Sequence, residues 1–151
     1  MLTIVLYNDG DIMQYWGSAR KNVGKPDQGG CYALIRECNA WRNAAKGYFV
    51  YGDMVKPKEY VCEEFCEFTV VRREKFIKKV PKVMANAFVY NGKRADVFVN
   101  YEKEAVIVRV PISKNEKVFL SSEDFTNGKG ETRVNDEITI APLSVVLIED
   151  V

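Results

Sequence analysis

The sequence contains no histidine, and this absence limits the chemistry that the chain can support. A metal site would have to use cysteines or carboxylates, because imidazole ligands are missing. The chain has four cysteines, Cys31, Cys38, Cys62 and Cys66. Their spacing matches neither the CxxC pairs of a zinc site nor a dense disulfide scaffold. No histidine or fixed basic group stands beside them to activate a nucleophilic thiol. We therefore expect free thiols in a reducing compartment, no metal and no cofactor.

An excess of one charge and long apolar runs are also missing. Lys and Arg number 22 against 21 Asp and Glu, so the net charge favours neither nucleic acid nor an anionic membrane as a partner. No run approaches the length of a membrane-spanning helix, and the start of the chain lacks the length and basic flank of a secretory signal. We expect a cytoplasmic protein with no nucleic-acid partner and no membrane partner.

The centre of the chain is predicted to be antiparallel β. Asn91-Gly92 separates two alternating apolar runs, and both residues tolerate the positive φ of a tight hairpin turn. The expected core row pairs Tyr90 with Lys93, Phe88 with Ala95, Asn86 with Val97 and Met84 with Val99. The opposite row is expected to meet water in part, and it contains Ala87, Val89, Arg94, Asp96 and Phe98. After a charged turn, the inward set continues with Val106, Val108 and Val110, while Arg109 points out.

Further short β runs flank this centre. They span residues 61–71, 76–80, 117–120, 137–140 and 144–148, separated by proline and glycine turns. About seven strands at this spacing are typical of an antiparallel sandwich or barrel. The predicted fold class is mainly β: an antiparallel β-sandwich of about seven strands preceded by one strand-loop-helix unit. The predicted domains are 1–55 and 56–151.

The strand-loop-helix unit occupies the first 55 residues. Leu2–Leu6 is a continuous apolar run, as in a strand buried on both faces, and the loop of about 20 residues that follows is long enough to suggest a function. From Cys31 to Val50 one helical stripe contains Leu34, Cys38, Trp41, Ala45 and Tyr48. Asp27 is a candidate N-cap, and Gly47 or Gly52 is the candidate stop.

A single buried-type strand needs neighbours, because an exposed flat apolar edge promotes association. Leu2–Leu6 could insert into the β-domain's own sheet, pair with a second copy of the chain, or belong to a larger parallel assembly whose other strands are missing. The abrupt start after Met1 favours the last alternative or a truncated gene.

Two pieces of the β region are distinctive: Val97-Phe-Val-Asn-Tyr101 and the link Ala141-Pro142-Leu143-Ser144 between the last two predicted strands. With these pieces, the order of elements resembles the C-terminal end of a (β/α)8-barrel glycoside hydrolase, in which the last βα unit precedes an all-β accessory domain. This resemblance implies that the catalytic carboxylates lie on barrel strands that precede this segment, so we assign no catalytic residue here. It also implies that the tip of Leu2–Leu6 lies on the active-site face.

The resemblance makes carbohydrate the candidate partner of the loop. Asn8, Asp9 and Asp11 could hydrogen-bond sugar hydroxyls, and Tyr15 and Trp16 could pack on a pyranose ring. The alternative is ordinary turn chemistry for the Asp-Gly-Asp segment and cover of an apolar edge by the Tyr-Trp pair.

Three functional hypotheses follow. The first is a non-catalytic β-sandwich portion of a glycoside hydrolase-like protein, which stabilises the barrel or shapes a carbohydrate cleft. The second is a free-standing carbohydrate-binding or protein-interaction module, including a homodimer. The third, ranked last, is an autonomous enzyme with a site among Asp9, Asp11, Tyr15 and Trp16.

Two stretches of opposite charge lie next to each other in the sequence. A basic stretch runs from Arg72 to Lys82, and an acidic run from Glu59 to Glu67 is expected to pair with it across a hairpin. Adjacent strand residues point to opposite faces, so Glu63 and Glu64 are not expected to form an acid/base couple.

Overall fold

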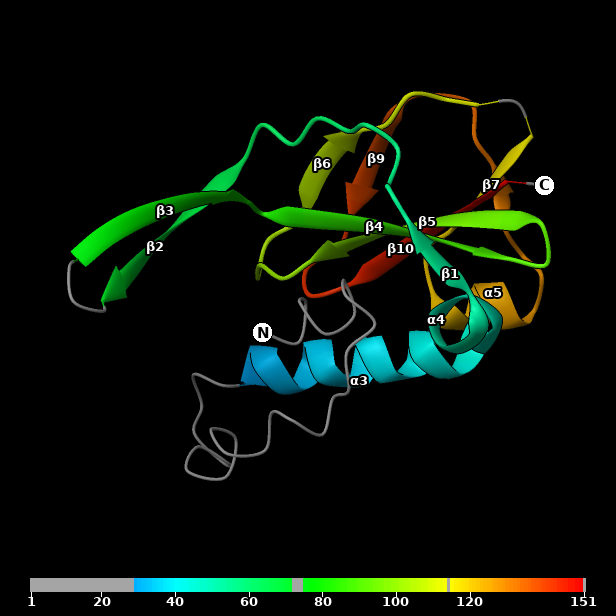
Figure 1. The fold of residues 1–151 in the computed structure, drawn as a ribbon, viewed down its shortest axis with the longest axis horizontal. Helices are drawn as coiled ribbons and strands as arrows, with labels where there is room; N and C mark the ends of the chain where they lie inside the picture. Colours follow the sequence, from blue (N-terminus) through cyan, green and yellow to red (C-terminus); the bar gives the residue numbers. More distant parts are fainter. Residues whose placement is uncertain (1–28, 72–74, 114, 151) are drawn as a thin grey trace.

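The computed structural model describes residues 29–71, 75–113 and 115–150, which form a mainly β structure (Figure 1). The helices of this part are α3 (Gly29–Ala44), α4 (Lys46–Tyr51) and α5 (Ser122–Thr126). Its strands are β1 (Asp53–Val55), β2 (Phe65–Val71), β3 (Lys75–Pro81), β4 (Val83–Tyr90), β5 (Lys93–Asn100), β6 (Val106–Arg109), β7 (Glu116–Phe119), β8 (Glu131–Thr132), β9 (Glu137–Ile140) and β10 (Val145–Asp150). The predicted mainly β, antiparallel class is confirmed.

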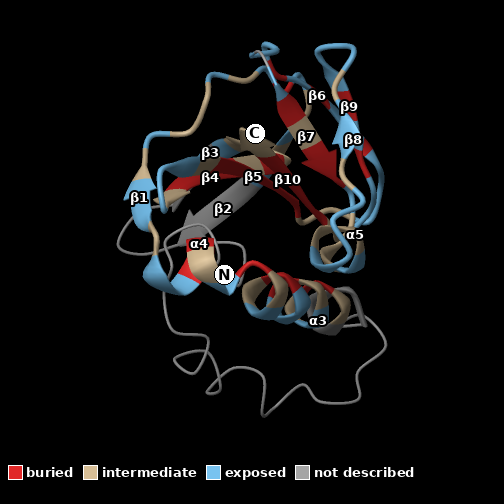
Figure 2. Ribbon diagram, turned by 90° about the vertical axis from the view of Figure 1, so that its right-hand side faces the viewer, coloured by how far each residue is buried: buried red, intermediate tan, exposed pale blue. Residues whose placement is uncertain are grey.

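Three layers build the body of the molecule (Figure 2). The middle layer is a six-stranded sheet of order β1-β4-β5-β10-β7-β8, in which each neighbouring pair is antiparallel. Helices α3 and α4 cover one face, and the two-stranded ribbon β6–β9 covers the other. Strands β2 and β3 form a separate two-stranded arm that extends away from the sheet (Figure 1).

The central hairpin has the predicted register. Strands β4 and β5 pair Met84 with Val99, Asn86 with Val97, Phe88 with Ala95 and Tyr90 with Lys93. Asn91 and Gly92 have φ of 51° and 76°, the positive values that a type I′ turn requires. Local turn chemistry therefore determines the alignment of the two longest strands of the sheet.

The expected solvent exposure of the second hairpin face is wrong for Ala87, Asp96 and Phe98, which are all buried. On that face Val89 and Arg94 are half-buried. The valines and isoleucines of the β6–β9 ribbon pack on Phe98. Asp96 lies under the segment after β1, where the Lys58 backbone N–H donates to its Oδ1 at 2.7 Å. Val106, Val108 and Val110 are buried and Arg109 is exposed, as predicted, but β6 pairs with β9 and leaves β10 as the second neighbour of β5.

The predicted helix is confirmed, with a break at Ala45. Every residue of the predicted stripe, Leu34, Cys38, Trp41, Ala45 and Tyr48, is buried against the sheet. Helix α4 ends at Gly52, where the backbone turns extended (φ −83°, ψ 153°). Glycine fits there because a Cβ would lie 2.5 Å from the carbonyl oxygen of Tyr48 and 3.0 Å from that of Val89. The candidate N-cap, Asp27, lies outside the described residues.

Three short elements were not predicted: β1, α5 and β8. A signal for α5 exists, since Ser121 and Asp124 have the spacing of an N-terminal cap. The Ser121 hydroxyl accepts a hydrogen bond from the Asp124 backbone N–H at 3.1 Å. Helix α5 places Phe125 against Trp41 and Phe119, with ring centroids 6.0 and 5.0 Å apart.

The N-terminal predictions concern the segment before Gly29. Strand Leu2–Leu6 and its loop lie outside the described residues, so the division into domains 1–55 and 56–151 stays a prediction. Helices α3 and α4 share one buried cluster with β4, β5, β7 and β10. No helix of the described part has the length and apolar character needed to cross a membrane.

Candidate functional site

The residues predicted to contact a sugar all precede the part of the chain that the structure describes. Asn8, Asp9, Asp11, Tyr15 and Trp16 lie outside the described residues and therefore stay predictions. The polar chemistry that the structure does describe lies on the sheet and at the base of the arm.

The carboxylates of Glu63 and Glu64 pair with cations from different elements. Glu63 lies 3.0 Å from Arg109 of β6, and Glu64 lies 2.9 Å from Lys82, which follows β3. The two groups are engaged separately, and they do not form an acid/base couple. The acidic and basic stretches pair across the β2–β3 hairpin as predicted, because Glu67 also stands opposite Lys79.

Three cysteines are free thiols, in agreement with the sequence-based expectation. Burial, together with the charge of Glu37, raises the pKa of Cys38 to about 12. Cys62 is buried, and its thiol donates to the carbonyl oxygen of Glu64 at 3.3 Å. The Cys66 sulfur lies 2.9 Å from the Tyr101 hydroxyl. The raised pKa of Cys38 disfavours a thiolate nucleophile at that position.

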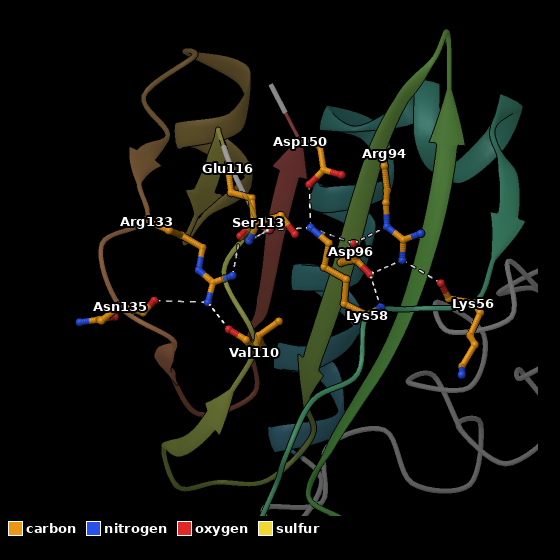
Figure 3. A network of polar contacts seen from close by, with 10 residues as sticks. All are labelled: Lys56, Lys58, Arg94, Asp96, Val110, Ser113, Glu116, Arg133, Asn135 and Asp150. Carbon is orange, nitrogen blue, oxygen red and sulfur yellow. Dashed lines mark hydrogen bonds and ion pairs between the residues drawn. The ribbon is translucent and has the colours of Figure 1, made fainter.

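The largest cluster of buried charge gathers around Lys58, in the segment that follows β1 (Figure 3). The Lys58 ammonium lies 2.6 Å from Glu116 Oε1 and 2.7 Å from Asp150 Oδ1. Asp96 Oδ2 is 4.0 Å from the same ammonium group. One lysine thus links β5, β7 and β10 at one end of the sheet.

Asp96 is fully buried and forms one end of this network. Its Oδ1 accepts hydrogen bonds from the Lys58 backbone N–H at 2.7 Å and from Arg94 NH2 at 2.9 Å. Its Oδ2 accepts from Arg94 Nε at 2.7 Å. Arg94 also donates to the backbone carbonyl of Lys56 at 2.7 Å, so this end of the network holds the segment between β1 and β2 onto the sheet.

Glu116 forms the other end, and its side chain is also inaccessible to solvent. Besides Lys58, it accepts from the Ser113 backbone N–H at 2.9 Å and from Arg133 NH1 at 2.6 Å. Arg133 NH2 donates in turn to the carbonyl oxygens of Val110 and Asn135. Arg133 Nε is buried without a hydrogen-bond partner.

The electrostatics of the network favour its charged form. Burial alone raises the pKa of Glu116, but hydrogen bonds from Lys58, the Ser113 N–H and Arg133 outweigh it, and the net shift is downward. Burial alone lowers the pKa of Lys58, but hydrogen bonds to Asp150 and Glu116 outweigh it, and the net shift is upward. Three cations face three carboxylates, so the cluster is balanced in charge.

This arrangement suits a structural role. Asp96 and Glu116 are each occupied by cations and backbone N–H donors, and they have no exposed side-chain surface that a substrate could reach. The network therefore positions the chain segment around Lys58. Sequence reasoning missed it, since alternation placed Asp96 on a face expected to meet water and Lys58 in a linker.

The two sequence pieces that carry the family resemblance meet at one corner. Asn100 is fully buried, and its side-chain amide donates to the carbonyl oxygens of Glu104, Ile140 and Ala141 at 2.7, 3.2 and 3.0 Å. Its backbone N–H donates to the backbone carbonyl oxygen of Ser144 at 3.0 Å. Asn100 thereby joins the turn after β5 to the link between β9 and β10. The adjacent Tyr101 hydroxyl donates to the carbonyl of Pro81, at the base of the arm.

The described residues line shallow surface hollows. One, of about 570 Å³, lies between α3 and α5 and is lined by Asn43, Ala44, Ser122 and neighbouring residues. Another, of about 240 Å³, is lined by Val61, Ile107, Arg109, Glu63, Glu64 and Glu137. The described residues contain no group of three or more cysteines and carboxylates arranged to hold a metal ion.

No family model, no curated protein and no solved structure matches this chain.

Proposed function

We propose that this chain is a non-catalytic β-sandwich portion of a glycoside hydrolase-like protein, which supports a preceding βα unit and helps to shape a carbohydrate cleft. The proposal extends the sequence resemblance, and carbohydrate is the partner it implies. Asn8, Asp9, Asp11, Tyr15 and Trp16 are the residues we assign to sugar contact.

The observation that supports the proposal is the burial of α3 and α4 in the sandwich. Trp41 and Phe49 have almost no exposed surface, and they lie in one cluster with Phe88 and Leu147 of the sheet. A helix held in this way fixes the direction in which the chain enters the sandwich. The sandwich would thus hold the preceding strand and loop in a defined position, as an accessory domain of this kind requires.

The test is binding of the full chain to an array of oligosaccharides. We expect the wild-type chain to bind at least one glycan, and Trp16→Ala to reduce that binding by up to about tenfold, because a stacked aromatic contact contributes roughly 0.5–1.5 kcal/mol beyond the area it buries. Tyr51→Ala is the control, since Tyr51 is a 62 % exposed aromatic on α4. Equal binding by wild type and Trp16→Ala would remove the loop from the proposed cleft.

A second candidate function is a protein-interaction module. It is supported by the β2–β3 arm, which extends beyond the body of the sheet (Figure 1). Phe65 and Ile77 of this arm are exposed. If a chain with an altered arm still binds glycans, the arm is not needed for carbohydrate binding. The two functions would then belong to different parts of the chain.

A further inference from the structure

The β2–β3 arm has one protected edge and one unprotected edge. Strand β3 contains Lys75, Lys78 and Lys79 and ends in Pro81, and charged residues and proline are common devices that block edge pairing. Strand β2 has the sequence FCEFTVV, with one charge, no proline and no glycine. Segments of this composition are prone to add a further strand. Among the described residues, β2 pairs with β3 alone.

The register shows which backbone groups of β2 face its open edge. The Lys82 N–H donates to the Glu64 carbonyl at 3.0 Å, one step beyond the pair Phe65–Pro81. Bonded and non-bonded pairs alternate along an antiparallel ladder, so residues 66, 68 and 70 bond to β3. Residues 65, 67, 69 and 71 therefore direct their N–H and C=O groups outward. Pro81, which has no N–H, falls on the non-bonded side, as this alternation requires.

The arm also lacks the support that a hairpin of this kind needs. A two-stranded hairpin is at best marginally stable in water, whereas three or more strands with an apolar face are stable. Phe65 and Ile77 on the arm are 44 % and 65 % exposed. Added strands would supply the missing neighbours and cover part of this apolar surface.

We propose that β2 pairs with β2 of a second copy of this chain, antiparallel about a two-fold axis at Phe68. This register joins the two arms into a four-stranded sheet of order β3-β2-β2-β3. It makes the outward-facing residues of β2 the hydrogen-bonded pairs: residue 65 faces residue 71 of the second copy, and Glu67 faces Thr69.

The charges of the two strands favour pairing of β2 with β2 of a second copy over the equivalent pairing of β3. In the β2 pairing no charged residue stands directly opposite a like charge, because Glu67 faces Thr69. The equivalent two-fold pairing of β3 would set Lys78 opposite Lys78 of the second copy and place Pro81, without an N–H, at a bonding position. Like charges directly opposite each other are destabilising. The surface proposed is distinct from Leu2–Leu6 and does not depend on carbohydrate binding.

The test is the oligomeric state of the full chain, measured by sedimentation equilibrium from about 1 μM to about 1 mM, because a small interface of this kind associates weakly. We expect a reversible dimer. Thr69→Lys sets a lysine opposite Glu67 of the second copy and should tighten the dimer on the order of fivefold, whereas Thr69→Glu should weaken it by a similar factor. Thr139→Lys and Thr139→Glu, on exposed positions of β9, are the matched controls and should change nothing.

A proline variant tests the backbone directly. Thr69→Pro removes one outward N–H while leaving the bonds to β3 in place, so it should yield a monomer with an unchanged circular dichroism spectrum. If Thr69→Pro unfolds the arm, the opposite effects expected of Thr69→Lys and Thr69→Glu on the dimer still test the proposed pairing. A wild-type chain that is monomeric throughout the concentration range overturns the proposal. A dimer that responds equally to the Thr69 and Thr139 variants also overturns it, because the interface then lies elsewhere.

Discussion

The two faces of the central sheet are closed in different ways. Under α3 and α4 the core is aromatic, and it includes Trp41, Tyr48, Phe49, Phe88 and Phe119. Under the β6–β9 ribbon it consists mainly of valine and isoleucine, with Phe98 as its buried aromatic residue. Asp96, Glu116 and Asp150 lie on this second face, since each is two residues from Phe98, Val118 or Ile148 along its strand.

The length of the covering element explains the difference. The paired helices α3 and α4 place one continuous apolar stripe across the sheet. Strands β6 and β9 have four residues each, too short to cover the strands they cross. The remaining end of the face is closed by the charge network around Lys58. A buried face without an apolar cover can thus be closed by ions, provided that every charge has a partner.

The largest effect is expected on the helix side. Trp41→Ala removes a fully buried indole at the centre of the aromatic core, and we expect the free energy of unfolding to fall by roughly 3–5 kcal/mol. Urea unfolding followed by circular dichroism measures it. Tyr51→Ala is the control, because Tyr51 is exposed and its removal should change stability by about 0.5 kcal/mol or less.

Hydrogen exchange on Trp41→Ala would sharpen the comparison. If α3 loses protection while β4 and β5 keep theirs, the two cores unfold separately. Simultaneous loss in both would show that they form one cooperative unit.

The next effect is expected in the charge network. Glu116→Gln keeps the shape of the side chain but leaves Lys58 and Arg133 without their shared anion, and we expect a loss of about 3 kcal/mol. Glu137→Gln removes an exposed partner of Arg109 and should cost about 0.5 kcal/mol or less. Equal effects of the two variants in urea unfolding would contradict a structural role for the network.

The network should also leave a signature in the pH dependence of stability. The pKa of Glu116 is lower in the folded chain, so its carboxylate adds stability above the unfolded pKa of about 4.3. That contribution disappears as the pH falls through the folded pKa. We expect the acid limb of the wild-type stability profile to be steeper than that of Glu116→Gln. If the free energy of unfolding falls equally steeply with acid in the two proteins, Glu116 is not the source of the acid sensitivity.

The smallest effect is expected in the ribbon core. Ile140→Val removes one buried methylene group and should cost about 1 kcal/mol. Ile107→Val makes the same change on β6 at a position that is 53 % exposed, and it should have almost no effect. Thermal unfolding of the two variants measures the contribution of the apolar part of this face. A loss well above 1 kcal/mol for Ile140→Val would indicate strain that spreads into the network.

Local features of the chain were readable from the sequence. The Asn91-Gly92 turn, the register of β4 and β5 and the buried stripe of α3 depend on neighbouring residues and on helical or strand periodicity. The cover over Phe98 was not readable, because it depends on β6 pairing with β9, about 30 residues further along the chain. The cover over Asp96 was not readable either, because it comes from Lys58, 38 residues earlier in the chain. The residues assigned to sugar contact remain predictions.

By itself, the sequence determined the main helix, the longer strands and the turn that joins the two longest strands, since these follow from interactions within a few residues. Only the tertiary structure decided that both faces of the sheet are buried and that Lys58 lies between Glu116 and Asp150. The physical reason is that alternation along a strand specifies two faces but not what covers each of them. The cover is chosen by packing between distant segments, and it also decides which charges must find partners in the interior.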